Sequence, residues 1–288
     1  MVYLRLFRFH QWIKNLLLFV PVVAGHQLSD HMLLAQVGWA FISFSFCASA
    51  VYIINDLVDV EYDRTHPTKK NRPFASRQVP PVHGVIIAVL LLFGSTFIAF
   101  QLPMQFMISL AIYFIITLAY TVKLKSIALM DVLLLAGLYT IRIIAGSKVA
   151  YIDLSFWLLT FSIFVFLSLA LVKRYSEMLL MQSIQQPAIR GRGYTASDLP
   201  LLLTMGIGSG FMSVLVLALY IDSPNIRQLY GHPELVWLLC PLFLYWISRV
   251  WLITHRGHMH DDPVVFALRD YASLVIAALG AVILWMAT

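Results

Sequence analysis

Charged residues are scarce in this chain. Only 12% of its 288 residues are Asp, Glu, Lys or Arg, while 60% are hydrophobic, and its mean hydropathy is +0.83. Soluble domains are typically about 25% charged and about 45–50% apolar. The composition therefore excludes an ordinary soluble domain and predicts a polytopic membrane protein.

Cysteine is equally scarce. Cys47 and Cys240 both lie in apolar runs and form neither a CxxC pair nor a Cys/His cluster, so neither a zinc site nor a disulfide is supported. The net charge of +6 could suggest a nucleic-acid partner, but the distribution of the charges fits membrane topology instead.

Long apolar runs are what the chain has in abundance. A membrane-spanning helix needs about 20 mostly apolar residues, and no soluble domain fits between the runs. We expect an all-α, polytopic integral membrane helical bundle that forms a single domain over residues 1–288. The first run could mimic a signal peptide, but it continues into further apolar sequence; it is the weakest candidate span, since it is short and Pro21 would kink it. The nine predicted spans are 12–26, 33–54, 83–101, 104–122, 127–147, 155–172, 201–221, 235–253 and 270–287.

The basic residues are distributed unevenly between the two sides of such a bundle. Cytoplasmic loops of membrane proteins carry an excess of Lys and Arg. If the N-terminus is cytoplasmic, 17 of the 20 Lys and Arg residues fall on the cytoplasmic side. We therefore expect an integral protein of the inner (cytoplasmic) membrane, with the N-terminus and active-site loops cytoplasmic and the C-terminus outside.

The segment from Asn55 to Arg72 concentrates four carboxylates and four Lys or Arg residues. Asp56, Asp59 and Asp63 are spaced i, i+3, i+7, which places them on one helix face with Asn55 alongside. Oxygen ligands suit Mg²⁺ or Ca²⁺, and Mg²⁺ commonly shares its ligand shell with substrate phosphates. The segment thus predicts a Mg²⁺–diphosphate site, although a solvated loop with local ion pairs is the simpler alternative.

The same segment resembles the first aspartate motif of the UbiA superfamily of intramembrane prenyltransferases. The similarity lies in Asn55-Asp56-x-x-Asp59-x-x-x-Asp63, followed by Arg64, His66-Pro67, Lys69 and Arg72-Pro73. The resemblance implies that Asn55, Asp56, Asp59 and Asp63 are catalytic. It also implies that the three aspartates hold Mg²⁺, and with it a diphosphate, inside an all-helical bundle open to lipid on one side.

Other segments are similar to the decaprenyl-phosphate phosphoribosyltransferase branch of that superfamily. The branch transfers 5-phosphoribosyl from phosphoribosyl diphosphate to a polyprenyl phosphate and releases diphosphate. Quinone-type members carry a second Asp-x-x-x-Asp motif between the sixth and seventh spans; here that region offers cations, Glu177 and a lone Asp198. The matching segments are Arg8-Phe-His-Gln-Trp12-Ile-Lys14-Asn15, Tyr139-Thr-Ile-Arg142, Leu171-Val-Lys173-Arg174-Tyr175-Ser-Glu177, Arg190-Gly-Arg192-Gly-Tyr194 and Asp261-Asp262-Pro263-Val-Val-Phe-Ala-Leu-Arg269-Asp270.

The resemblance also yields a set of expected substrate-binding residues, most of them cations that would offset the repulsion between two anionic substrates. Arg142 is the strongest candidate, because an Arg within a span is costly and usually faces the bundle interior. Its alternative role is a structural ion pair with Asp131. The expected residues are Lys14, Asn15, Arg64, Lys69, Arg72, Tyr139, Arg142, Lys173, Arg174, Tyr175 and Glu177.

Several of these residues have simpler explanations. Lys14, Lys173 and Arg174 could be anchors at span ends, and Tyr139 and Tyr175 could serve in packing. His66 could cap a helix, and Lys123 and Lys125 are expected to be topology signals. For Asp261, Asp262, Arg269 and Asp270 the sequence suggests no chemistry.

Two other functions fit parts of the sequence. A polyprenyl-diphosphate-dependent prenyltransferase with an aromatic or lipophilic acceptor would use the same first motif, but the missing second aspartate cluster counts against it. An ion-coupled transporter would show charged or helix-breaking residues at mid-span in paired halves, whereas here the charges cluster in loops.

Overall fold

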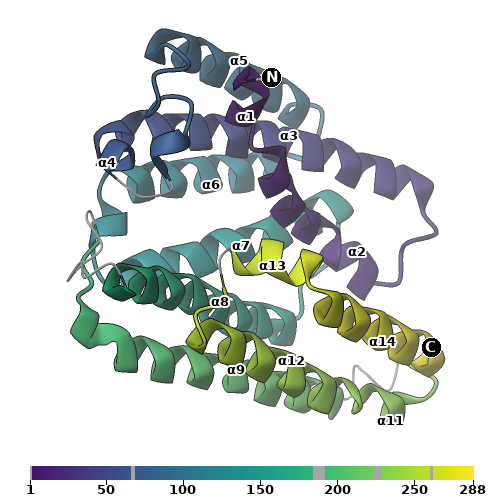
Figure 1. Ribbon diagram of the computed structural model, residues 1–288. Coiled ribbons are helices and arrows are strands. Elements are labelled where there is room, and N and C mark those ends of the chain that lie inside the picture. Colours follow the sequence, from purple (N-terminus) through teal and green to yellow (C-terminus); the bar gives the residue numbers. More distant parts are fainter. Residues whose placement is uncertain (1, 66–68, 184–191, 224–228, 260–261) are drawn as a thin grey trace. The chain divides into compact units, whose positions relative to one another are not determined.

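The computed structural model describes residues 2–65, 69–183, 192–223, 229–259 and 262–288, and every element in these ranges is helical. This confirms the all-α class. The helices gather into two compact units (Figure 1). Unit 1 comprises Met1–Leu134 and Leu138–Leu154, and unit 2 comprises Leu135–Gly137 and Ser155–Thr288.

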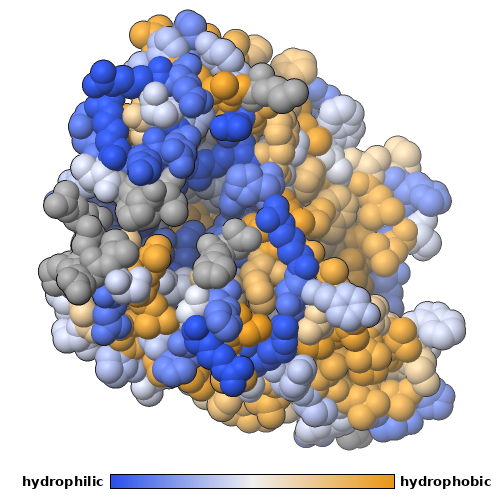
Figure 2. Space-filling view, in the orientation of Figure 1, coloured by the Kyte–Doolittle hydropathy of each residue, from blue (hydrophilic) through white to orange (hydrophobic). Residues whose placement is uncertain are grey.

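Within the described ranges, seven helices are long and apolar enough to cross a membrane. An eighth span results if Pro263–Arg269 and Tyr271–Ala287, which meet at a bend of 77°, are counted together. The sequence predicted about nine. Hydrophobic side chains cover much of the helix flanks in Figure 2, as expected for surfaces that face lipid.

The predicted span 12–26 accounts for the difference. The structure forms a 3₁₀ helix, η1 (Phe9–Phe19), followed by the short α2 (Val20–Ala24). Pro21 lies in the first turn of α2, where a helix tolerates proline because the missing N–H has no partner there anyway. The proline therefore marks the start of a helix instead of a kink within a longer one.

Unit 1 is built around the 28-residue α3, which packs against α5, α6 and η1 (Figure 1). Ser43 of α3 and Ser95 of α5 exchange hydrogen bonds, each hydroxyl donating to the other residue's carbonyl at 2.8 and 2.7 Å. Such small polar contacts allow close helix approach in membranes. The elements of unit 1 are α1 (Val2–Leu6), η1, α2, α3 (His31–Val58), α4 (Val60–Thr65), η2 (Lys69–Asn71), α5 (Pro81–Ala99), α6 (Met104–Val122), η3 (Leu124–Ser126) and α7 (Met130–Ala150).

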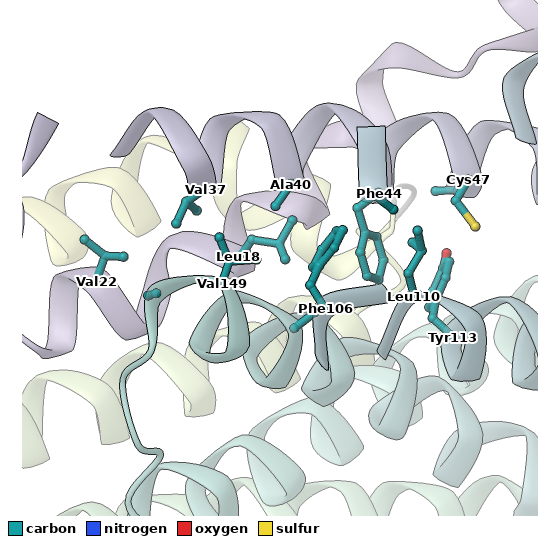
Figure 3. Packing of buried hydrophobic residues seen from close by; sticks show 14 of the residues in the cluster. Leu18, Val22, Val37, Ala40, Phe44, Cys47, Phe106, Leu110, Tyr113 and Val149 are labelled. Atoms are coloured by element: carbon teal, nitrogen blue, oxygen red, sulfur yellow. The ribbon is translucent and has the colours of Figure 1, made fainter. Parts of the chain in front are cut away.

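The core of unit 1 joins the N-terminal segment to α3, α6 and α7 (Figure 3). Phe44 and Phe106 are fully buried at its centre, and Leu18 of η1 is equally shielded. The centroids of the Phe44 and Tyr113 rings lie 4.5 Å apart. Burial of side chains of this size stabilises the fold by about 1.5–3 kcal/mol each, which fixes α3 and the aspartates at its end.

Unit 2 is a second helical bundle, in which α8 packs along α9 and α12 contacts both α9 and α14. The predicted span 235–253 falls within Pro233–His255, one of the seven apolar helices long enough to cross a membrane, in which α11 leads into α12. The elements of unit 2 are α8 (Phe156–Ser183), η4 (Ala196–Asp198), α9 (Leu199–Ile221), α11 (Pro233–Val236), α12 (Leu239–His255), α13 (Pro263–Arg269) and α14 (Tyr271–Ala287).

Gly146 is where α7 meets η1 most closely. A Cβ atom added at Gly146 would lie 2.0 Å from the carbonyl oxygen of Leu18. Backbone cannot yield as a flexible side chain can, so this contact requires glycine.

We expect Gly146→Ala to lower the free energy of unfolding by about 1–3 kcal/mol, the usual cost of overpacking. Thermal unfolding in detergent measures this. The matched control is Gly137→Ala on the same helix, where no atom lies within 4 Å; it should be neutral or stabilising, because Ala favours helix over Gly. Equal effects of the two substitutions would contradict the steric explanation.

Candidate functional site

The aspartate segment begins at the end of α3, the longest helix of unit 1. The sequence predicted one helix face for Asp56, Asp59 and Asp63. Instead α3 ends at Val58, Asp59 caps it, and Asp63 lies on the separate α4. Backbone hydrogen bonds continue across the break, from Asp59 N to Asn55 O and from Asp63 N to Asp59 O, but the side chain of Asp59 pairs with Lys125.

Asp56 and Asp63 converge on Arg72. Nη1 of Arg72 donates to Oδ1 of Asp56 at 2.9 Å and to Oδ2 of Asp63 at 2.7 Å. Both carboxylates are nearly buried. Burial raises the pKa of Asp63, and the adjacent Arg72 acts in the opposite direction. Two acids and one guanidinium thus form the centre of the site.

Arg8 is the second cation on Asp56. Its Nη2 donates to both oxygens of the carboxylate, at 2.6 and 2.8 Å, and its guanidinium lies 5.2 Å from the centroid of the Tyr52 ring. Arg8 lies 48 residues before Asp56, so the sequence gives no local signal of this contact and indicates Arg8 only as part of a matching segment.

Asp59 pairs with Lys125 of η3. Nζ of Lys125 lies 2.5 Å from Oδ1 of Asp59, and both side chains are largely shielded, with 13% and 20% exposed. Lys125 was expected to be a topology signal, yet it provides the counter-charge of a predicted metal ligand. Lys123, its neighbour in the sequence, is exposed.

The other predicted residues of this segment are distributed around the acidic pair. Arg64 forms an exposed ion pair with Glu61 at 2.6 Å. The charge of Lys69 of η2 is close enough to oppose in part the rise that burial causes in the pKa of Asp63. Asn55 is half-buried on α3, and His66 and Pro67 lie outside the described residues. In Figure 2, hydrophilic side chains gather around the end of unit 1 that carries α4 and η2.

Whether Mg²⁺ fits can be judged from these acids. No group of three or more His, Cys, Asp or Glu within the described ranges is arranged for a metal, and Asp59 faces Lys125 instead of the other two. Asp56 and Asp63 nevertheless present oxygens to one point, where Nη1 of Arg72 stands in for a cation. Since Mg²⁺ usually takes only one or two protein carboxylates, this pair fits the ion once Arg72 is displaced.

A second group of predicted residues is buried within unit 1 around Arg142. Its Nε donates to Oδ1 of Asn15 at 2.9 Å, Nη2 donates to the hydroxyl of Tyr113 at 3.2 Å, and Nη1 donates to the carbonyl of Leu138. Its guanidinium lies 4.8 Å from the centroid of the Tyr113 ring and 5.7 Å from that of Tyr139. Arg142 is only 4% exposed, so these contacts replace water around its charge.

The alternative ion pair between Arg142 and Asp131 is wrong. Both residues lie on α7, and a separation of eleven positions corresponds to about 16 Å along a helix. Lys14 belongs to the same buried group, because its Nζ lies 5.5 Å from the centroid of the Tyr139 ring. The structure thus brings together four of the expected substrate-binding residues, Lys14, Asn15, Tyr139 and Arg142.

In unit 2 the predicted cations are paired with acids. Nζ of Lys173 lies 3.1 Å from Asp262. Arg174 is fully buried, forms an ion pair with Glu177, and lies 5.7 Å from the centroid of the Tyr194 ring. Such pairing is compatible with both the structural role and the substrate-binding role that the sequence left open.

The acids without predicted chemistry in unit 2 act as helix caps. Asp262 accepts a hydrogen bond from the backbone N–H of Val264 at the start of α13. Asp270 caps α14 through Ser273 N, and Arg249 donates to its two oxygens at 2.6 and 3.0 Å. Asp261 and Arg190 lie outside the described residues, and Arg269 ends α13.

Tyr175 forms the remaining polar contact of this group. Its buried hydroxyl lies 2.9 Å from Nδ1 of His255, and its ring meets Trp251 edge-on. His255, like Arg8 and Lys125, was not predicted. All three become recognisable only through their contacts with a predicted residue.

Comparison with known proteins places the chain in a family. The sequence model of the "UbiA prenyltransferase family" matches residues 17–274 of this chain. The chain is 38% identical to the decaprenyl-phosphate phosphoribosyltransferase of Mycobacterium tuberculosis, covering 96% of this chain and 89% of that one. It is 34% identical to the nodulation protein NoeC of Azorhizobium caulinodans, over 99% of this chain and 93% of that one.

An uncharacterized protein, y4nM of Sinorhizobium fredii, is 39% identical over 95% of this chain, but the chain spans only about half of that relative's length, 53%. Among solved structures, a UbiA homolog from Archaeoglobus fulgidus bound to GPP and Mg²⁺ matches with a TM-score of 0.72 at 17% identity, over 99% of both chains. This likeness confirms the UbiA-like fold, and the family match confirms the resemblance indicated by the aspartate motif.

We expect Lys125→Ala to destabilise the protein by about 1–2 kcal/mol. This value lies between those of exposed and buried ion pairs, because the Asp59 carboxylate would lose its counter-charge. Thermal unfolding in detergent without Mg²⁺ measures the effect. Lys123→Ala, on the exposed neighbour, is the matched control and should change the stability by less than about 0.5 kcal/mol. A similar loss in both variants would show that the Asp59–Lys125 pair is unimportant.

Proposed function

Because this chain belongs to the UbiA prenyltransferase family and is therefore an integral membrane transferase, we propose that it transfers a 5-phosphoribosyl group. The donor is phosphoribosyl diphosphate, the acceptor is a polyprenyl phosphate, and diphosphate is released. The observation that carries the proposal is the convergence of Asp56 and Asp63 on one point, with Arg8 and Arg72 beside them. Carboxylates for a divalent cation and guanidinium groups for phosphate oxygens are what a diphosphate site requires.

Asp56 and Asp63 are the residues that would hold Mg²⁺, with Asp59 available after release from Lys125. The ion would supply charge neutralisation of the leaving diphosphate. The chain itself supplies Arg72 and Lys69, whose positive charges favour an anion at the same place. Carboxylates close to the reacting carbon of the ribose also stabilise the positive charge that develops there as its bond to diphosphate weakens.

The acceptor is an anion at neutral pH and needs no strong base, so the protein must chiefly hold two anions close together. Lys14 and Arg142 are suited to the acceptor phosphate. Both are almost fully buried, and Arg142 donates hydrogen bonds to an amide, a hydroxyl and a carbonyl, all of them neutral groups. An anionic headgroup would add a negative charge to the neutral groups that surround Arg142 among the described residues.

Unit 2 provides support for the donor class. In the region where quinone-type members carry a second aspartate motif, the described residues show Lys173, Arg174 and Tyr175 with Glu177. This favours a donor with an additional phosphate over one that needs a second metal. The 38% identity to the mycobacterial phosphoribosyltransferase points the same way.

A prenyl diphosphate donor is the second candidate. The Archaeoglobus homolog was solved with GPP and with DMAPP, and the first aspartate motif serves either donor. Membership of a transferase family disfavours the ion-coupled transporter. The placement that we propose remains the cytoplasmic membrane, with the N-terminus and the site on the cytoplasmic side.

The test uses purified protein in detergent with Mg²⁺ and two substrate pairs. One pair is phosphoribosyl diphosphate with a polyprenyl phosphate; the other is a polyprenyl diphosphate with an aromatic acid. We expect diphosphate release and a phosphoribosylated lipid, identified by mass, from the first pair only. Product from the second pair alone would overturn the donor while leaving the site in place.

Asp56→Asn should reduce the rate by about a hundred-fold or more, the scale seen when a group that stabilises transition-state charge is lost. The matched control is Glu61→Gln, because Glu61 lies in the same segment but is exposed and pairs only with Arg64 among the described residues. We expect near-normal activity for this control. Full activity of Asp56→Asn would refute the metal role of the acidic pair.

A further inference from the structure

Arg8 adopts an unusual backbone conformation between α1 and η1. Its φ and ψ are 49° and 48°, in the left-handed region. Residues with a Cβ atom pay a conformational cost there, and such residues cluster at functional sites. Here the conformation brings the guanidinium group of the N-terminal segment onto Asp56.

The contact between Arg8 and Asp56 uses only one of the three guanidinium nitrogens. Nη2 donates to both carboxylate oxygens, while Nε and Nη1 have no hydrogen-bond partner among the described residues. The side chain is 19% exposed, so this edge can be reached. A guanidinium group with unused donors is well suited to binding phosphate oxygens.

Asp56 pairs with two arginines, one of which it shares with Asp63. Arg72 already donates to it at 2.9 Å, and the carboxylate is only 6% exposed. Arg72 also neutralises Asp63, so the acidic pair and the two arginines balance before any ligand binds. A divalent cation at Asp56 would compete with both arginines for the same oxygens.

The N-terminal segment holds Arg8 in this position independently of Asp56. Nε1 of Trp12 donates to Oγ of Ser49 at 2.9 Å, and that hydroxyl donates to the carbonyl of Phe7 at 2.7 Å. Further along, the amide of Asn15 donates to Ser45. Displacement of Arg8 from Asp56 therefore moves its side chain and leaves its backbone beside the acidic pair.

We propose that Arg8 is a phosphate-binding residue for the diphosphate of the donor. It pairs with Asp56 in this structure; with that carboxylate committed to a divalent cation, the guanidinium group would donate to the diphosphate oxygens. This inference rests on the proposed function, since it assumes a diphosphate at Asp56. The alternative is that Arg8 is only a structural partner of Asp56.

The two roles predict opposite effects on diphosphate binding. If Arg8 only neutralises Asp56, its removal eliminates a competitor of the metal, and Mg²⁺–diphosphate binds as tightly as before or more tightly. If Arg8 binds phosphate, its removal weakens diphosphate binding while the affinity for Mg²⁺ alone is maintained or increased.

The experiment is calorimetric titration of the full-length protein in detergent, first with Mg²⁺ alone and then with inorganic diphosphate at saturating Mg²⁺. For Arg8→Gln we expect about ten-fold or weaker diphosphate binding, the scale of one charge-assisted hydrogen bond, without loss of Mg²⁺ affinity. Arg8→Lys keeps the positive charge but loses the planar guanidinium group, so its diphosphate affinity should be intermediate. It also provides the test if Arg8→Gln fails to fold. The matched control is Arg5→Gln, an exposed cation of α1, and it should match the parent.

Unchanged or tighter diphosphate binding by Arg8→Gln, or an equal loss in Arg5→Gln, would overturn the proposal. So would a parallel loss of affinity for Mg²⁺ alone, since Arg8 would then act only by holding Asp56. If the parent protein binds no diphosphate in the presence of Mg²⁺, the proposed function fails together with this inference. Normal binding by both the parent and Arg8→Gln would refute the role of Arg8 alone.

Discussion

A carboxylate that is nearly shielded from water needs a counter-charge, and this requirement determines the arrangement of unit 1. Asp56 and Asp63 lose most of their hydration in the fold, a loss that costs several kcal/mol per ion unless a partner compensates for it. Arg72 provides one such partner from the segment that follows α4, and Arg8 provides another from the N-terminal segment. The acidic pair thus holds together parts of the chain that are separate in sequence.

The same requirement shapes the interior around Arg142. A guanidinium group buried among helices is surrounded by aromatic rings and neutral hydrogen-bond acceptors, and its bond to Asn15 ties α7 to η1. In unit 2 the buried or half-buried cations have acidic partners instead, such as Glu177 for Arg174 and Asp270 for Arg249. Among the described residues, Asp56 and Asp63 of unit 1 face a common point, whereas these pairs of unit 2 each join one cation to one acid.

The sequence was sufficient for the helices, because long apolar runs leave few alternatives in a membrane. It also located the acidic segment, since the spacing of Asp56, Asp59 and Asp63 is a local signal. It could not show that Asp59 pairs with Lys125, a residue 66 positions later, because so distant a contact leaves no local signal. Arg8 and His255 were missed for the same reason. The predicted first span 12–26 is not one long helix. Asn15 and Leu18 contact α3 and α7, and these contacts, which the apolar character of the segment does not reveal, accompany a 3₁₀ helix.

The hydrogen bonds of Asn15 have a consequence for the order of assembly during synthesis. Its amide nitrogen bonds Ser45 and its amide oxygen accepts from Arg142. Asn15 is translated more than a hundred residues before Arg142 of α7. This segment therefore makes its last hydrogen bond only after α3, α5, α6 and more than half of α7 have been translated.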